Sequence, residues 1–193
     1  MSSGPLLSPV VAAEDLRQVF LGLPQPVAVV TGLSPSGQPV GMTVSSLTSA
    51  SLAPPLVLFC PAVTSRTWAA ARERGTFAVN ILGHQHVELA VRFAGPGDRF
   101  AGLRTLPADV GIPMLADALT VLVCDVGDEH PAGDHTVVLG RVRAVHALRD
   151  GTGLDTVSLR ARGTPPRGGW YSADDVPHSG STHQWAPPPT VLV

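Results

Sequence analysis

Residues 41–51 are the part of this sequence richest in groups that could bind a ligand. Six of these eleven residues are Ser or Thr. Their hydroxyls, together with backbone N–H groups between two expected strands, could bind the polar edge of a planar ligand. A solvated loop whose hydroxyls bond to their own backbone is an equally weighted alternative.

Two further segments carry side chains suited to anion binding or proton transfer. Residues 64–67, Thr-Ser-Arg-Thr, stand at the expected start of a helix, where hydroxyls and a guanidinium could hold a phosphate-sized anion. For that segment alone, an ordinary helix cap with a surface arginine is favoured. His135 follows Gly133 and Asp134 at the entrance of a long expected strand, where it could be a proton relay or a turn histidine without a role.

The residue types also exclude several kinds of chemistry. All 13 basic residues are arginine, which excludes a P-loop lysine and a Schiff-base lysine. The sequence has no run of basic residues, so no nucleic-acid partner is expected. The absence of an H-E-x-x-H motif and of a Cys/His ligand set predicts no metal site, and no G-x-S-x-G motif marks a serine nucleophile. Asp98 and Arg99, in a turn-rich segment, could form a local ion pair, which by itself indicates no function.

Hydropathy and cysteine placement bear on the compartment. No apolar run reaches 18 residues, so no membrane partner is expected. The apolar N-terminus lacks the preceding positive charge of a secretory signal. Cys60 and Cys124 each end an apolar run and are expected to be buried free thiols. These features predict a cytoplasmic protein.

The elements that must position these segments are short strands with single helices between them. Gly and Pro number 20 and 19, which is typical of a chain with many turns. About six strands, paired antiparallel, predict a mainly β fold: a small Greek-key split β-barrel with a few inserted α-helices. The absence of G-x-G-x-x-G disfavours a Rossmann fold. Strands are expected at 27–31, 40–44, 56–60, 77–82, 119–126 and 136–147, helices at 13–20, 66–74 and 87–93, an irregular connection at 101–118 and a polar loop at 127–135.

The length of 193 residues fits one folded domain with extensions. Residues 1–13 are expected to form a flexible N-terminal arm, and residues 14–162 the barrel. Residues 163–193 are rich in Pro and Gly and cannot build a core of their own. This tail is expected to pack on the barrel or on a partner subunit.

Several motifs occur in one order between residues 14 and 148, about two-thirds of the chain. They are residues 26–31, 39–57, 65–68, 77–82, 92–100 and 133–142. In this order they resemble the short-chain flavin reductase family, which is built on the FMN-binding split barrel. The resemblance implies a homodimer that reduces FMN or FAD with NADH or NADPH and supplies the reduced flavin to a partner monooxygenase.

The resemblance also implies roles for particular residues, none of them derived from spacing. The isoalloxazine edge would be lined by Thr43, Val44, Ser45 and Ser46. The ribityl chain would lie near Ser49 and Ser51, and the phosphate end near Ser65, Arg66 and Thr67. Phe93 would sit beside the flavin, and His135, the one catalytic candidate, would lie near the nicotinamide.

The sequence departs from the family pattern at Ser45, at Gln25-Pro26 and past Arg149, where a longer tail replaces the usual short ending. Ser45 stands where many members have Asn, and Gln25-Pro26 where many have Thr-Gly. A second hypothesis is therefore kept: a flavin-binding barrel that retains its flavin, as a sensor or store, or that acts directly on an organic substrate. A third is a barrel that binds no flavin, in which residues 41–51 are only a loop.

Overall fold

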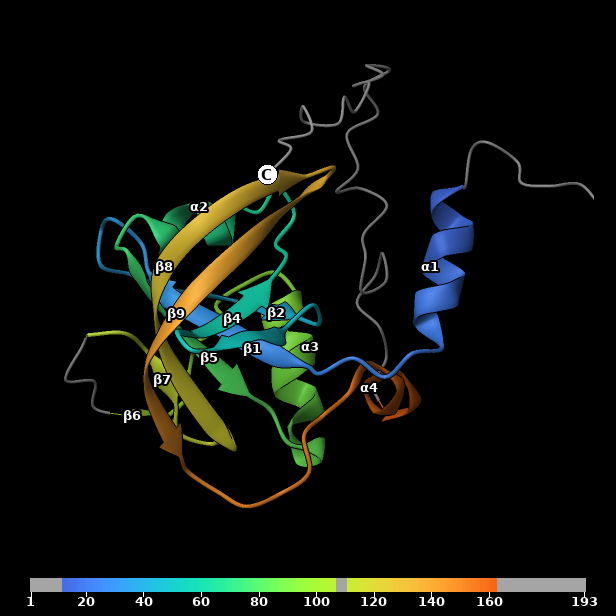
Figure 1. The fold of residues 1–193 in the computed structure, drawn as a ribbon. Coiled ribbons are helices and arrows are strands. Elements are labelled where there is room, and N and C mark those ends of the chain that lie inside the picture. Colours follow the sequence, from blue (N-terminus) through green and yellow to red (C-terminus); the bar gives the residue numbers. More distant parts are fainter. Residues whose placement is uncertain (1–11, 107–110, 163–193) are drawn as a thin grey trace, which may run out of the picture.

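Seven strands form one antiparallel sheet in the computed structural model, which describes residues 12–106 and 111–162 (Figure 1). The strand order is β2-β1-β5-β8-β9-β4-β3. A separate two-stranded sheet pairs β6 (Thr105–Leu106) with β7 (Met114–Leu115). The seven strands are β1 (Ala28–Leu33), β2 (Pro39–Val44), β3 (Thr48–Leu52), β4 (Pro55–Phe59), β5 (Thr76–Ile81), β8 (Thr120–Ala132) and β9 (His135–Ala147).

The two edge strands of this sheet, β2 and β3, are joined by residues 45–47 alone. A connection of three residues forces the sheet to curl until its first and last strands come together. Within the described residues no ladder pairs β2 with β3, so the curled sheet stays open along that line. The predicted mainly β class is confirmed, with seven strands in the sheet where about six were expected.

Helices cover the sheet on both faces. One core cluster joins Val29 and Val121 to Phe93 of α3 (Val87–Ala94) and Leu159 of α4 (Thr156–Arg162). The other joins Ala28 and Val30 to Trp68 of α2 (Arg66–Arg72). Because β1 is buried on both faces, its side chains are apolar at successive positions rather than at alternate ones. This explains the uninterrupted run at residues 27–30.

The predicted polar loop at 127–135 is wrong. β8 continues to Ala132 and β9 begins at His135, so only Gly133 and Asp134 form the turn, with Gly133 at φ +66°. Polar residues in the outer part of β8 hide the strand in the sequence. Glu129 shows their purpose, because its carboxylate accepts hydrogen bonds from Trp68 Nε1 at 2.7 Å and from Arg72 at 2.7 Å.

Four other elements differ from the sequence-based expectations. β3 overlaps the segment 41–51, for which a solvated loop was an alternative, and α4 was not expected at all. β6 and β7 form a short ladder within residues 101–118, where an irregular connection was expected. The expected helices at 66–74 and 87–93 and strands at 40–44 and 77–82 are present within one or two residues of those bounds. A one-turn 3₁₀ helix, His84–His86, precedes α3.

The helix α1 (Ala13–Leu21) stands beside the sheet, with none of its residues buried (Figure 1). α4 anchors the segment between α1 and β1, since Thr156 donates its N–H to the Gln25 carbonyl at 2.9 Å and its hydroxyl to the Leu23 carbonyl at 3.1 Å. In the described part of the chain no helix is long and apolar enough to cross a membrane. Most of the expected N-terminal arm and the whole 163–193 tail lie outside the described residues.

Candidate functional site

The end of β2 contributes its backbone to the site more than its side chains. Thr43 donates its hydroxyl to the Ala90 carbonyl of α3 at 2.6 Å, and the Val44 side chain is buried in the core. β2 pairs on one side with β1 and is an edge strand on the other. Alternate backbone N–H and C=O groups of an edge strand point away from the sheet, where a ligand can bind them.

The connection from β2 to β3 is fixed against the strand that follows. Ser46 Oγ accepts a hydrogen bond from the Cys60 N–H at 2.8 Å, immediately after β4. On β3, exposed Ser49 lies opposite Val57, and half-buried Ser51 lies opposite Leu56 after a register shift. The predicted ring-edge and ribityl residues therefore lie along one continuous ribbon of β2, its connection and β3.

The predicted anion-binding segment begins α2. Ser65 caps the helix, because its Oγ accepts from the Trp68 N–H at 3.1 Å. The Ser65 hydroxyl also lies 3.4 Å from the sulfur of Met42, which sets this first turn against β2. Arg66 is exposed, whereas Thr67 is half-buried.

His135 reaches the same region from the far end of the chain. Its backbone bridges to Ala62, Val63 donates to the Asp134 carbonyl at 2.9 Å, and Thr136 donates to the Pro61 carbonyl at 2.9 Å. The turn of the β8–β9 hairpin is thereby bound to the loop that leads into Ser65. The three segments singled out in the sequence are thus brought together.

The His135 ring has a defined tautomer when it is neutral. Its Nδ1 lies 2.7 Å from an Asp134 carboxylate oxygen, and an ionised carboxylate only accepts hydrogen bonds. Nδ1 therefore carries the proton, and Nε2 of the neutral ring is an acceptor. The ring is one-third exposed, so a ligand can reach it.

Phe93 lies beneath β2 and is fully buried. Its ring meets Phe100 edge to face, with centroids 5.1 Å apart. A Cβ added at Gly41 would lie 2.7 Å from Phe93 Cε1 and 3.2 Å from Phe100 Cζ. The absent side chain at Gly41 therefore lets this aromatic pair support the strand that carries Thr43 and Val44.

Arg99 also lies in this region, although the sequence analysis considered it only as a partner of Asp98. It makes no ion pair with Asp98, whose carboxylate accepts the N–H groups of Phe100 at 3.0 Å and Ala101 at 3.1 Å. The Arg99 guanidinium instead donates to the Gly41 carbonyl at 2.6 Å and to Thr67 Oγ1 at 3.2 Å. The local ion pair considered from the sequence is not formed. Contacts 58 and 32 residues away in the chain leave no local pattern from which they could be predicted.

A small cavity of about 50 Å³ lies at the end of β2, where Thr43 and Val44 form part of its wall. Its lining includes Ser45, Phe20 of α1 and Arg160 of α4. Pockets that enclose drug-sized ligands are several hundred Å³ in volume. This cavity is too small to enclose a flavin ring.

The thiols and the remaining ionisable groups add no reactive centre to this region. Burial raises the pKa of Cys124 to about 12, and it raises the pKa of half-buried Cys60 as well. Both cysteines were expected to be buried, but Cys60 is only half-buried. Within residues 12–106 and 111–162, no group of three or more His, Cys, Asp or Glu side chains could hold a metal ion.

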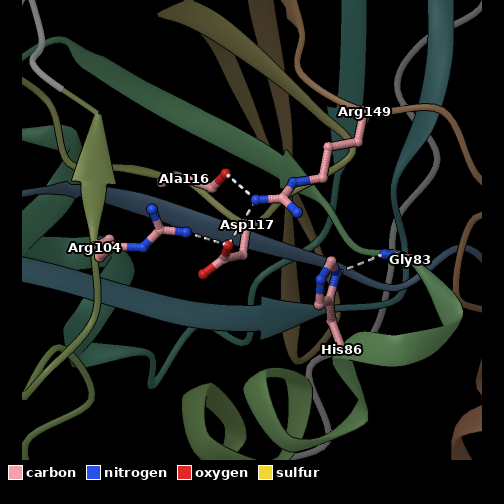
Figure 2. Close-up of polar contacts among 6 residues, drawn as sticks. All are labelled: Gly83, His86, Arg104, Ala116, Asp117 and Arg149. Carbon is pink, nitrogen blue, oxygen red and sulfur yellow. Dashed lines mark hydrogen bonds and ion pairs between the residues drawn. The ribbon is translucent and has the colours of Figure 1, made fainter.

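A second polar cluster lies at the opposite end of the β8–β9 ladder (Figure 2). Asp117 accepts from Arg104 at 2.9 Å and from Arg149 at 2.8 Å. Nearby, His86 Nδ1 accepts from the Gly83 N–H at 3.1 Å. Burial lowers the pKa of His86, against the attraction of Asp117 and together with the repulsion of Arg149. β9 has 13 residues, so about 40 Å of strand separates this cluster from His135.

The protein is a curled, open seven-stranded sheet with a few helices, and hydroxyls, guanidinium groups and a histidine gather beside its β2 edge. Residues 20–158 match the family model described as the flavin reductase like domain. The chain belongs to this family, and the resemblance stated from the sequence is confirmed.

Named relatives agree with this assignment. The chain is 42% identical over 137 residues to a flavin reductase (NADH) of Kitasatospora aureofaciens, a match that covers 69% of this chain and 72% of the relative. It is 39% identical over 137 residues to the actinorhodin polyketide dimerase of Streptomyces coelicolor, with coverage of 70% and 77%. It is 38% identical over 125 residues to the flavin-dependent monooxygenase reductase subunit HsaB of Rhodococcus jostii, with coverage of 64% of each.

Some relatives are considerably longer than the matched region. The chain spans 56% of the stachydrine N-demethylase reductase subunit Stc3 of Rhizobium meliloti. Solved structures show the same fold over most of their length. BorF, the flavin reductase component of a bacterial two-component tryptophan halogenase, has a TM-score of 0.68 and 30% identity, with coverage of 76% of this chain and 94% of BorF. The flavin reductase HpaC, solved with NADP⁺, has a TM-score of 0.67 and 28% identity, with coverage of 75% and 97%.

Proposed function

We propose that this protein reduces FMN or FAD with NADH or NADPH as the hydride donor. One observation carries the proposal: three segments distant in the sequence meet at the open edge of a flavin reductase fold. Ser46 bonds to the residue after β4, Ser65 lies against Met42, and His135 bridges to Ala62. The match over residues 20–158 supports the same activity.

The donors in this region suit a flavin mononucleotide unit. The side chains of Thr43, Val44 and Ser46 are occupied within the protein, so in the proposal their backbone groups, with Ser45, meet the isoalloxazine edge. The hydroxyls of Ser49 and Ser51 suit a polyol chain. Ser65, Arg66 and Thr67 offer hydroxyls and a guanidinium to a phosphate. In the proposal, Phe93 does not contact the flavin but packs against Gly41 and so supports β2.

Hydride transfer between nicotinamide and flavin is chemistry that the two cofactors supply when bound. The chain's own residues bind and orient them. N–H groups aimed at the ring edge stabilise the negative charge that develops on reduction. The neutral His135 ring offers Nε2 as an acceptor, which suits the carboxamide N–H of a nicotinamide.

The proposal includes a homodimer and a partner monooxygenase. The cavity at Ser45 is too small to enclose a flavin, so a second subunit is the proposed source of the missing wall. Rhodococcus jostii HsaB is named as a monooxygenase reductase subunit and BorF as a reductase component, which supports an oxygenase partner for this chain. The free thiols of Cys60 and Cys124 support a cytoplasmic location. No nucleic-acid or membrane partner is part of this proposal.

A second candidate function is a barrel that retains its flavin and acts directly on an organic substrate. The similarity to the Streptomyces coelicolor actinorhodin polyketide dimerase favours it. In that case the flavin would stay bound through purification, and free flavin would not exchange rapidly.

The test of these alternatives is oxidation of NADH and NADPH by the purified protein, with FMN, FAD or no flavin added. The proposal predicts rapid oxidation that depends on added flavin. Tight flavin binding without turnover would replace it with the flavin-retaining alternative. If the protein showed no turnover and bound no flavin, both candidate functions would be overturned.

A further inference from the structure

The Arg99 side chain connects three segments that surround the proposed flavin site. Its Nε donates to the Gly95 carbonyl at 2.8 Å, just after α3. Its Nη1 donates to the Gly41 carbonyl of β2 at 2.6 Å and to Thr67 Oγ1 of α2 at 3.2 Å. A guanidinium spreads its donors over three nitrogens in a fixed plane, whereas the three donors of a lysine ammonium all come from one atom. Arg99 therefore sets the spacing between β2 and α2.

The charge of this guanidinium is not neutralised locally. In the described part of the chain its hydrogen-bond partners are two carbonyls and a hydroxyl, and no carboxylate forms an ion pair with it. The adjacent Asp98 carboxylate is used by two backbone N–H groups. The side chain is half-buried, and its burial lowers the pKa of Arg99, although an arginine stays protonated at neutral pH. A half-buried cation without a counter-ion favours an anionic group beside it.

The bond to Thr67 also determines what the Thr67 hydroxyl can do. Because Oγ1 accepts from Arg99, the hydroxyl proton must point elsewhere. None of the residues in 12–106 or 111–162 accepts that proton in a hydrogen bond. A hydroxyl that accepts from a cation is a stronger donor. The Thr67 hydroxyl can therefore donate a hydrogen bond to a bound ligand.

We propose that Arg99 is a positioning residue of the flavin site, which orients the Thr67 hydroxyl as a donor to the flavin phosphate and holds β2 at Gly41 in register with it. The proposal rests on the function proposed above. Arg99 acts on the phosphate through Thr67, and no direct contact with the ligand is required.

A double-mutant cycle with two ligands tests this role. The variants are Arg99→Gln, Thr67→Val and the double variant, and the ligands are FMN and riboflavin, which differ only by the phosphate. Affinity is measured by flavin fluorescence. Each single variant is expected to weaken FMN binding by about tenfold or more, the size of a lost hydrogen bond to a charged group, and riboflavin binding by much less. The double variant is expected to lose little more than one single variant, because both remove the same interaction.

Two further variants separate positioning from a general loss of structure. Thr67→Ser keeps the hydroxyl and is expected to retain the preference for FMN over riboflavin. Arg99→Lys keeps the charge but not the planar spread of donors, so it is expected to lose part of that preference. Equal losses for FMN and riboflavin in Arg99→Gln, or strictly additive losses in the cycle, would overturn the role of Arg99.

The outcomes also distinguish this role from the activity itself. Flavin-dependent NADH oxidation by the wild type together with an additive cycle would overturn the role of Arg99 alone. A wild type that neither binds nor reduces flavin would overturn both.

Discussion

Arg99 and the pair Arg104 and Arg149 show two ways in which this fold uses arginine. Arg99 is half-buried and donates to neutral acceptors from three segments. Arg104 and Arg149 are 72% and 47% exposed and share one carboxylate, Asp117 (Figure 2). Exposed ion pairs contribute little to stability because water and salt screen them. The comparison separates the Arg99 region, which is the proposed anion site, from the Asp117 cluster, whose arginines are more exposed to solvent.

The β8–β9 hairpin connects these regions and is held differently at its two ends. At the turn end, Glu129 binds Trp68 and Arg72 of α2, and the turn itself bonds to residues 61–63. At the other end the polar contacts are the exposed pairs of Asp117. Substitution of Glu129 or of the turn residues that contact residues 61–63 should therefore change ligand binding, and substitutions at the Asp117 end should not.

Gly41→Ala is expected to have the largest effect. Its Cβ would meet Phe93 at 2.7 Å within a buried aromatic pair, and such overpacking costs about 1–3 kcal/mol. The displaced strand should also lose flavin affinity. Thermal unfolding and flavin titration measure the two effects. Gly22→Ala, whose Cβ would have only an ordinary contact at 3.8 Å, is the control. Equal stability of both variants would contradict the packing described for β2.

Arg66→Ala should weaken FMN binding by about 1.5–3 kcal/mol, through the loss of a charge-assisted hydrogen bond. Arg104→Ala removes an arginine from the other region and should leave FMN binding unchanged. Isothermal titration of both variants with FMN measures the difference. Unchanged FMN affinity in Arg66→Ala would remove Arg66 from the phosphate end.

His135→Ala should slow NADH-dependent reduction more than it weakens flavin binding. A single hydrogen bond contributes about 1 kcal/mol, so we expect roughly a fivefold effect on the rate at limiting NADH. His130→Ala, on the exposed outer part of β8, is the matched control. Stopped-flow reduction and flavin titration separate the two effects, and equal losses in both would argue against a role at the nicotinamide.

Asp117→Asn is expected to change stability by less than about 1 kcal/mol and to leave flavin reduction unaltered. The effect should shrink further at high salt, because both ion pairs are exposed. Chemical denaturation at two salt concentrations tests this. A large loss of activity would show that the Asp117 cluster belongs to the functional site.

The smallest expected effect is a pH dependence from His86. Burial lowers the pKa of His86 in the folded state, so the unfolded chain binds the proton more readily. Stability from this residue is therefore present above the unfolded pKa of about 6.5 and declines as the pH falls below it. His86→Gln should flatten that part of the stability profile, as measured by thermal unfolding between pH 5 and 8. A wild-type slope retained in the variant would assign the effect to another group.

The sequence predicts much of the framework because local patterns determine it. β1, β2 and β5 were expected from short runs of apolar and β-branched residues. The order of motifs around residues 41–51, 65–68 and 133–142 was sufficient to identify the family. These features depend on neighbouring residues or on motifs, so no tertiary contact is needed to find them.

What the sequence does not predict depends on distant contacts. The outer part of β8 lacks an apolar pattern because Glu129 bonds to a helix 61 residues earlier in the chain. Arg99 has an acidic neighbour in sequence, yet its partners are on β2 and α2. Tertiary geometry determined the outcome in each case.

The central claim is that one flavin site is formed by the β2 edge, the first turn of α2 and the turn of the β8–β9 hairpin. A crystal structure of the FMN complex tests it most directly. The account predicts a phosphate oxygen within about 3.2 Å of Thr67 Oγ1, the ring edge along residues 43–46, and Arg99 still bonded to Gly41. FMN bound at the Asp117 cluster, or a phosphate remote from Thr67, would contradict it.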